Sequence, residues 1–190
     1  MRTLISTAFI SLDGVVEDPG GQTGYRNGGW TFRAVDFVPE AYAIKGTEQE
    51  ESTAMMLGRT SYELFSPVWP GMDDFSHYRD LPKYVVSTTL SDDDLVTDWG
   101  PTTILRSLDE VSALKETEGG PIIIHGSVTL NHALADAGLI DRYNLLVFPL
   151  LLGAGQRLFS NSDQDTRKLT LVDSEVFSNG IQKNVFDVVH

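Results

Sequence analysis

The sequence predicts a three-layer α/β fold, built on a mostly parallel mixed sheet flanked by helices, with an antiparallel hairpin at its C-terminal end. Short apolar runs, the first of them rich in β-branched residues, recur along the chain at 3–11, 53–57, 83–88, 102–105, 121–125 and 142–149. Helix-like segments separate most of these runs, an alternation typical of parallel sheets. Residues 168–189 instead form two alternating runs joined by Asn179-Gly180, a strong hairpin signal.

Local signals place the helices between these strands. Residues 39–52 begin with proline, which suits a first turn, and 60–65 read as a short helix directly after a strand. A capping box starts the next helix at Ser107, and we expect that helix to end around the two glycines before the fifth strand. The last helix is expected over 128–137, with a glycine as its C-terminal cap.

Composition favours one domain over residues 1–190 and excludes several classes of protein. The formal net charge of -13 and pI near 4.5 argue against nucleic acid or an anionic membrane as partner. The chain has no cysteine, so disulfides and thiolate chemistry are excluded. No apolar run resembles a signal peptide or a membrane span, because the longest, at 145–152, is short and contains a proline. We therefore expect a soluble, cytoplasmic protein.

Three predicted strand ends carry small or hydrogen-bonding residues: Gly58-Arg59-Thr60, Ser87-Thr88-Thr89 and His125-Gly126-Ser127. Ligands of open α/β sheets bind at the carboxyl ends of the strands. Two of these ends lead into helices, whose N-terminal N–H groups attract anions, and Arg59 adds a planar cation suited to a phosphate. Each turn alone is most simply explained as a turn, whereas three on one sheet favour a nucleotide.

Other motifs are incomplete. There is no Walker sequence, and Gly153-Ala154-Gly155 follows a strand but has Leu158 in place of the third glycine of a dinucleotide fingerprint. Ser127 lies two residues from His125, yet no nucleophile elbow surrounds it, and a serine there also suits a helix cap. The four histidines show no ligand spacing, so no metal site is predicted.

Four stretches resemble one known family: "ISLDG" after the first strand, "LGRTSYE" at 57–63, "VVSTTL" at 85–90, and "HGSVTLNHALADAGLIDRYNLLVFPLLLGAGQRLF" at 125–159. Together they resemble the dihydrofolate reductase-like superfamily. More narrowly, they resemble the reductase domain of bacterial bifunctional riboflavin-biosynthesis enzymes, the RibD C-terminal domain. The resemblance runs from the first strand to the last hairpin, and the stretch at 125–159 is its most specific part.

The resemblance implies NADPH as cofactor, held by eight residues at the strand ends: Gly58, Arg59, Thr60, Ser87, Thr88, Gly126, Ser127 and Val128. Residues 58–60 would meet phosphate groups, with Arg59 near the 2′-phosphate. Residues 87–88 would flank the adenosine, and backbone N–H groups of 126–128 would hold the pyrophosphate. The positive end of a helix dipole would let an acidic protein bind this anionic cofactor.

The substrate side departs from the family. Riboflavin-pathway enzymes typically end the strand before this turn with Glu-Gly-Gly, and an imidazole at His125 replaces that carboxylate. This leaves the ribosylaminopyrimidine substrate open. In true dihydrofolate reductases a carboxylate on the first helix binds the pterin ring, and Asp36, Glu40 and Glu48 all lie in the matching region. The sequence does not decide among them, and each also suits a surface charge.

Two residues are candidates for catalysis. Asp13 matches the family's Ser-Leu-Asp-Gly and would lie beside the nicotinamide, or would simply form a turn with the next glycine. The proton that accompanies hydride transfer would come from Asp13, from His125 or from water. Trp30, Phe32 and Trp69 are predicted to wall an apolar substrate pocket, or else to belong to the core.

The leading hypothesis is an NADPH-dependent reductase that transfers hydride to a C=N or C=O bond of a small heterocyclic or sugar-like substrate, such as a riboflavin-pathway ribosylaminopyrimidine or a pterin. One alternative is a non-catalytic nucleotide-binding or regulatory protein on the same scaffold. Another is a hydrolase that uses His125 and Ser127. The C-terminal hairpin and the family resemblance also imply a homodimer.

Overall fold

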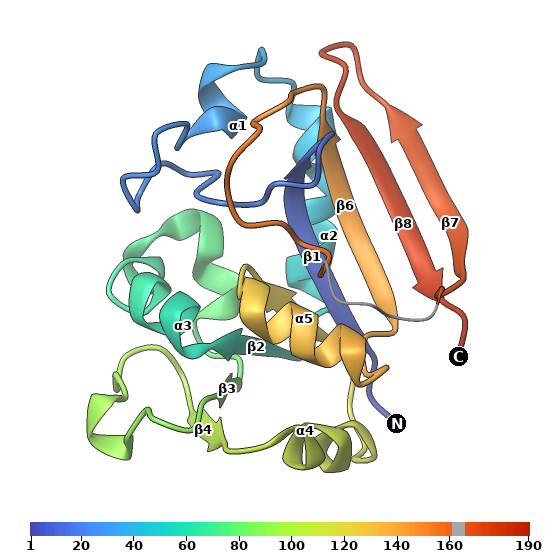
Figure 1. The fold of residues 1–190 in the computed structure, drawn as a ribbon. Helices are drawn as coiled ribbons and strands as arrows, with labels where there is room; N and C mark the ends of the chain where they lie inside the picture. Colours follow the sequence, from blue (N-terminus) through green and yellow to red (C-terminus); the bar gives the residue numbers. More distant parts are fainter. Residues whose placement is uncertain (161–165) are drawn as a thin grey trace.

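A computed structural model describes residues 1–160 and 166–190 of the chain, and one eight-stranded sheet runs through it (Figure 1). The strand order is β4-β3-β2-β5-β1-β6-β8-β7. All neighbours from β4 to β6 pair in parallel, and β8 pairs antiparallel with both β6 and β7. The strands are β1 (Leu4–Ser11), β2 (Ala54–Gly58), β3 (Lys83–Val86), β4 (Thr102–Leu105), β5 (Ile122–His125), β6 (Arg142–Phe148), β7 (Leu169–Val176) and β8 (Gln182–Val188).

Helices cover both faces of this sheet, and Figure 1 shows α5 in front of it and α2 behind. The α-helices are α1 (Trp30–Arg33), α2 (Ala43–Glu51), α3 (Arg59–Phe65), α4 (Leu108–Lys115) and α5 (Val128–Asp136). The described residues also form four short 3-10 helices: η1 (Pro39–Tyr42), η2 (Trp69–Gly71), η3 (Asp73–Tyr78) and η4 (Asp92–Asp94). None of the described helices has both the length and the apolar character needed to cross a membrane.

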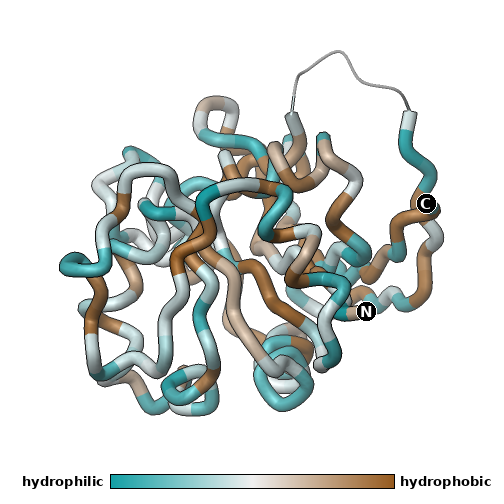
Figure 2. The backbone as a smooth tube through the Cα atoms, turned by 90° about the horizontal axis from the view of Figure 1, so that it is seen from below, coloured by the Kyte–Doolittle hydropathy of each residue, from teal (hydrophilic) through white to brown (hydrophobic). Residues whose placement is uncertain are grey.

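The central strands are apolar on both faces, as expected of parallel strands covered on two sides. Along β1, Leu4 packs into a cluster with residues of α4 and α5, whereas Ile5 points to the opposite face and packs with α3 and the aromatic rings after it. A third cluster on this second face surrounds Phe148 of β6. In Figure 2 the brown, hydrophobic stretches accordingly run through the middle of the molecule and the teal stretches lie mainly around it.

The C-terminal hairpin predicted from Asn179-Gly180 is confirmed, but its loop is longer than the two-residue turn that this dipeptide usually forms. The N–H of Gly180 donates to the carbonyl of Phe177 at 2.9 Å, and the N–H of Phe177 donates to the carbonyl of Ile181 at 2.9 Å. Gly180 alone takes the left-handed conformation, with φ 83°, so the loop holds three residues. All eight residues of β7, the strand before this turn, are exposed. They offer a candidate contact surface for the homodimer, which stays a prediction.

The fold class is confirmed, while two helix boundaries and one additional short helix differ from the predictions for local reasons. Proline opens residues 39–52 as the 3-10 helix η1 before α2 begins. Helix α4 has the predicted cap, since Ser107 Oγ accepts from the N–H of Glu110 at 3.2 Å. It ends at Lys115, ahead of the glycines, because Thr117 turns its N–H and hydroxyl back to the carbonyl of Leu114. The long loop at 13–35 contains α1, which the sequence did not indicate.

Candidate functional site

The carboxyl ends of β3, β2 and β5 lie next to one another, because these strands are parallel neighbours. They bring the turns at Ser87, Gly58 and Gly126 to one edge of the sheet, where ligands of open α/β sheets bind. We call these three turns the strand-end row. The three stretches singled out in the sequence thus form one continuous surface.

The turn after β5 is tied to its neighbours by a serine. Gly126 and Ser127 both take the left-handed conformation, with φ 59° and 61°. Ser127 Oγ accepts from the N–H of Gly58 at 2.9 Å and donates to the carbonyl of His125 at 3.2 Å. Its N–H donates to Ser61 Oγ at 2.9 Å. A Cβ on Gly126 would lie only 3.2 Å from that same hydroxyl oxygen, so the backbone passes close to α3 and needs glycine.

The same turn leaves donors for an anion. The N–H of Val128 belongs to the first turn of α5, where N–H groups have no intrahelical acceptor and carry the positive end of the helix dipole. Asn131 Nδ2 donates to the carbonyl of Gly126 at 2.6 Å, which holds that carbonyl against the helix. Of the residues expected to hold the pyrophosphate, Ser127 therefore serves the turn and Val128 keeps a donor.

Arg59 lies at the start of α3 and reaches toward the neighbouring strand end. Its Nε donates to Glu63 Oε1 at 2.7 Å, and its Nη1 donates to Thr89 Oγ1 at 2.8 Å. The arginine side chain is 44% exposed. The guanidinium thus lies between the ends of β2 and β3 with donors left for a ligand. Thr60, the next residue, is exposed in the same turn.

A second arginine was missed by sequence reasoning. Arg106 follows β4, and its Nη1 donates to the carbonyls of Ser87 and Leu90 at 2.9 and 2.6 Å. Ser87 Oγ in turn accepts from the N–H groups of Thr89 and Leu90 at 3.2 and 3.0 Å. Ser87 is therefore committed to its turn, while Thr88 is exposed. The position of Arg106 directly after a predicted strand was the available signal.

A buried polar cluster lies where β5, β1 and β6 run side by side. The register places Thr7 between His125 and Asn144. Glu48 of α2 covers them, accepting from Thr7 Oγ1 at 2.7 Å and from Asn144 Nδ2 at 2.9 Å. Lys45, one helical turn earlier, approaches Glu48 Oε2 at 3.2 Å and donates to Thr7 Oγ1. Thr7, Lys45, Glu48 and Asn144 are called the Lys45–Glu48 cluster below.

This geometry separates the three carboxylates that the sequence left open. Glu48 is 5% exposed and points at the central strands, whereas Asp36 and Glu40 are exposed on the segment before α2. A buried carboxylate requires hydrogen-bond partners, and Glu48 has them. Helical spacing could have suggested the pairing of Lys45 with Glu48, but nothing in the sequence pointed to Thr7 or Asn144.

His125 is held as a neutral imidazole. Its Nε2 lies 3.0 Å from the hydroxyl oxygen of Tyr78, and the ring of Trp69 packs edge-on at 5.4 Å between centroids. Burial, with a smaller effect of the Lys45 ammonium, lowers the pKa of His125 to about 3. Ser127 Oγ bonds the backbone carbonyl of His125 and the imidazole bonds Tyr78, so these contacts do not form the Ser–His pair that a hydrolase would use.

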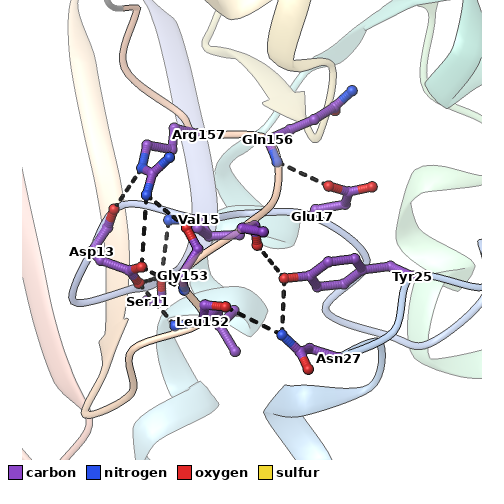
Figure 3. Close-up of polar contacts among 11 residues, drawn as sticks. Ser11, Asp13, Val15, Glu17, Tyr25, Asn27, Leu152, Gly153, Gln156 and Arg157 are labelled. Carbon is purple, nitrogen blue, oxygen red and sulfur yellow. Dashed lines mark hydrogen bonds and ion pairs between the residues drawn. The ribbon is translucent and has the colours of Figure 1, made fainter.

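Asp13 joins two loops (Figure 3). Its Oδ1 accepts from Ser11 Oγ at 2.6 Å and from the N–H of Leu152 at 3.1 Å, and its Oδ2 accepts from the N–H of Gly153 at 2.8 Å. Arg157 Nη2 lies 3.8 Å from Oδ2. The hydrogen bond from Ser11, helped by the backbone N–H groups, lowers the pKa of Asp13 to about 2. Asp13 is therefore ionised near neutrality, which argues against it as the proton donor.

The three predicted pocket aromatics do not form one wall. Trp30 is 2% exposed and belongs to the cluster around β6. Phe32 is 67% exposed on α1. Trp69 belongs to a different cluster, stacked between Phe65 and Phe75 with centroids 4.2 Å away on each side. Trp30 and Trp69 thus fill separate cores, which is the alternative that the sequence left open, and Trp69 is the one of these rings that contacts His125. Among the described residues no group of acidic or histidine side chains converges as metal ligands would.

Comparisons with known proteins agree with this fold. Residues 2–183 match the family model of the RibD C-terminal domain. The uncharacterized protein YyaP of Bacillus subtilis (strain 168) is 26% identical over 196 residues, which cover 97% of this chain and 94% of that protein.

Solved structures share the fold at lower identity. A protein of Shewanella sp. PV-4, whose name places it in riboflavin biosynthesis, superposes with a TM-score of 0.76 at 20% identity and 99% coverage of both chains. Dihydrofolate reductase from Enterococcus faecalis, complexed with NADP(H) and RAB-propyl, superposes with a TM-score of 0.61 at 14% identity, covering 99% of this chain and 97% of the reductase.

Proposed function

Because the chain belongs to the RibD C-terminal domain family, we propose that it is an NADPH-dependent reductase. The reaction is hydride transfer to a C=N or C=O bond of a small heterocyclic or sugar-like substrate. The solved reductase with NADP(H) and the Shewanella riboflavin biosynthesis protein, which share the fold, support this proposal. The homodimer and the cytoplasmic location stay predictions.

The strand-end row is the single observation that carries the proposal. It aligns a glycine turn, a helix N-terminus and two arginines along one edge of the sheet. A protein with a net charge of -13 repels an anionic dinucleotide at long range, so binding one requires local features of this kind. Local cations and oriented N–H groups supply the attraction instead.

The residues present fit such a cofactor. Glycine at position 126 lets this turn pack against α3, since a Cβ there would lie 3.2 Å from Ser61 Oγ. In this proposal the N–H of Val128 holds the pyrophosphate, Arg59 binds the 2′-phosphate, and Thr88 with Arg106 flanks the adenosine. The bound cofactor would supply the hydride. The chain would orient the substrate beside it.

Of the three proton sources considered, water fits best. Asp13, with a pKa of about 2, holds no proton near neutrality. His125, with a pKa of about 3, is a neutral imidazole that shares its Nε2 contact with Tyr78. Neither side chain is an effective general acid at neutral pH.

Titration with NADPH and NADH tests the proposal. We expect NADPH to bind at least tenfold more tightly than NADH, because Arg59 forms charge-assisted hydrogen bonds with the 2′-phosphate. Arg59→Ala should remove this preference, while Arg33→Ala, at an exposed arginine on α1, should leave it intact. If neither nucleotide binds, the proposal is wrong.

A non-catalytic nucleotide-binding protein is the second candidate. The observation that favours it is that both predicted catalytic side chains are in protonation states unsuited to proton donation. NADPH oxidation with a panel of pterins, pyrimidines and aldehydes separates the two functions. Tight NADPH binding without turnover of any panel member would favour the binding protein.

A further inference from the structure

The group of the Lys45–Glu48 cluster that a ligand can reach is the cation. The side chain of Lys45 is 18% exposed, whereas that of Glu48 is 4% exposed. Glu48 is also fully engaged, since Oε1 accepts from Thr7 and Asn144 and Oε2 faces the ammonium. A ligand that approaches this cluster therefore meets a lysine in front of a carboxylate that is already paired.

The hydrogen bonds of the cluster leave one acceptor without a protein partner and one lysine contact that is long. An ammonium has three N–H donors; Lys45 Nζ donates to Thr7 Oγ1 and lies 3.2 Å from Glu48 Oε2, but its contact with Glu48 Oε1 is 3.5 Å long, which a ligand acceptor can replace. Asn144 Oδ1 is buried and has no hydrogen-bond partner among the residues that the structure describes. An unpaired buried acceptor is costly, so a neutral N–H or O–H donor from outside the chain would stabilise this site, whereas a cationic donor would meet the Lys45 ammonium.

The cluster also adjoins the strand-end row. Thr7 pairs in register with His125, the residue before the glycine turn. The Lys45 ammonium contributes to the low pKa of His125, as expected of a nearby positive charge. Through its hydrogen bond with Thr7, Lys45 is therefore one strand away from the residue that precedes the turn after β5.

We propose that Lys45 is the substrate-recognition residue of this site, donating to a carbonyl or carboxylate oxygen of the substrate. The Lys45–Glu48 pair then excludes ligands that carry an amidine-type cation, because their charge meets an ammonium and the carboxylate has no free oxygen to bind them. The role in substrate binding rests on the proposed function; the charge preference of the site does not.

Calorimetric titration with two probes tests this charge preference. Benzoate carries an acceptor carboxylate, and trimethoprim carries a diaminopyrimidine that pairs with free carboxylates. We expect the wild-type protein to bind benzoate and not trimethoprim. Lys45→Met should weaken benzoate at least tenfold and strengthen trimethoprim at least tenfold, because the carboxylate of Glu48 becomes available. Lys168→Met, at an exposed lysine ahead of β7, is the matched control and should change neither affinity.

The proposal is overturned if the wild-type protein binds no benzoate or prefers trimethoprim, or if folded Lys45→Met keeps both wild-type affinities. Should Lys45→Met fail to fold, Glu48→Gln gives an independent answer. It keeps the ammonium and removes its carboxylate, so benzoate should bind at least threefold more tightly than to wild type. Weaker benzoate binding would refute the proposal.

An NADPH titration of the same samples separates this inference from the proposed function. Benzoate preference without NADPH binding would leave the charge preference of the site and refute the reductase. NADPH binding without benzoate preference would refute the role of Lys45 and leave the reductase.

Discussion

Replacing His125 tests whether the imidazole is held neutral against Tyr78 and Trp69. An unfolded histidine has a pKa of about 6.5, whereas burial lowers that of His125 to about 3. The unfolded state therefore binds more protons between these values, and the contribution of His125 to stability is lost as the pH falls from about 6.5 toward 3. At pH 5 the unfolded histidine is almost fully protonated and the folded one is not. The difference corresponds to about 2 kcal/mol of lost stability, from RT ln(1 + 10^1.5).

Urea unfolding of the wild-type protein and of His125→Gln at pH 7.5 and pH 5.0 measures this loss. The other titrating groups are common to both proteins, so their effects cancel in the difference between the two unfolding free energies. We expect the stability advantage of the wild type over His125→Gln to shrink by about 2 kcal/mol on going to pH 5.0. His77→Gln, at an exposed histidine on η3, should keep the pH dependence of the wild type. A difference that is constant within ~0.5 kcal/mol would refute the neutral, buried imidazole.

Three further predictions follow from the fold and the site. Gly126→Ala should lower the midpoint of thermal unfolding and weaken NADPH binding at least tenfold. A residue with a Cβ in the left-handed conformation costs roughly 1–2 kcal/mol, and this Cβ would lie 3.2 Å from Ser61 Oγ. Unchanged unfolding and binding would contradict this prediction. Lys115→Met should lower the free energy of unfolding in urea by about 3 kcal/mol, because it removes the buried ammonium that lies 2.7 Å from Asp141. A loss below ~1 kcal/mol would show that the pair contributes no more than a solvent-exposed ion pair. Light scattering after size exclusion should show a homodimer for the wild type and a monomer for Leu171→Lys on the exposed face of β7, and a monomeric wild type would refute the dimer.

The fold was predictable because its signals are local. Short apolar or alternating runs identified every strand, and the alternation of strands with helices indicated parallel pairing before any contact was known. The cap at Ser107 and the turn at Gly180 were visible as short motifs. Helix ends were harder to predict. Helix α4 ends before the glycines because the hydroxyl of Thr117 donates to the carbonyl of Leu114, a local contact that the sequence pattern did not reveal.

The site was only partly predictable, because the strand-end row is formed by short sequence motifs whereas the Lys45–Glu48 cluster joins residues far apart in the sequence. The strand-end row follows from strand direction alone, so glycine and arginine turns pointed to it. The Lys45–Glu48 cluster depends on the register between β1 and β6 and on the placement of α2 over both. Glu48 was among the candidates, but only tertiary packing distinguishes a buried carboxylate from an exposed one. The choice between pocket and core for Trp30 and Trp69 likewise depended on tertiary packing.

The most direct test of the central claim is to follow the backbone amide signals of the 20.9 kDa protein by NMR while NADPH is added. The account predicts the largest shifts at the strand-end row, at Gly58, Gly126 and Val128, and none along β7. Shifts confined to other parts of the chain, or no shifts at saturating NADPH, would contradict it.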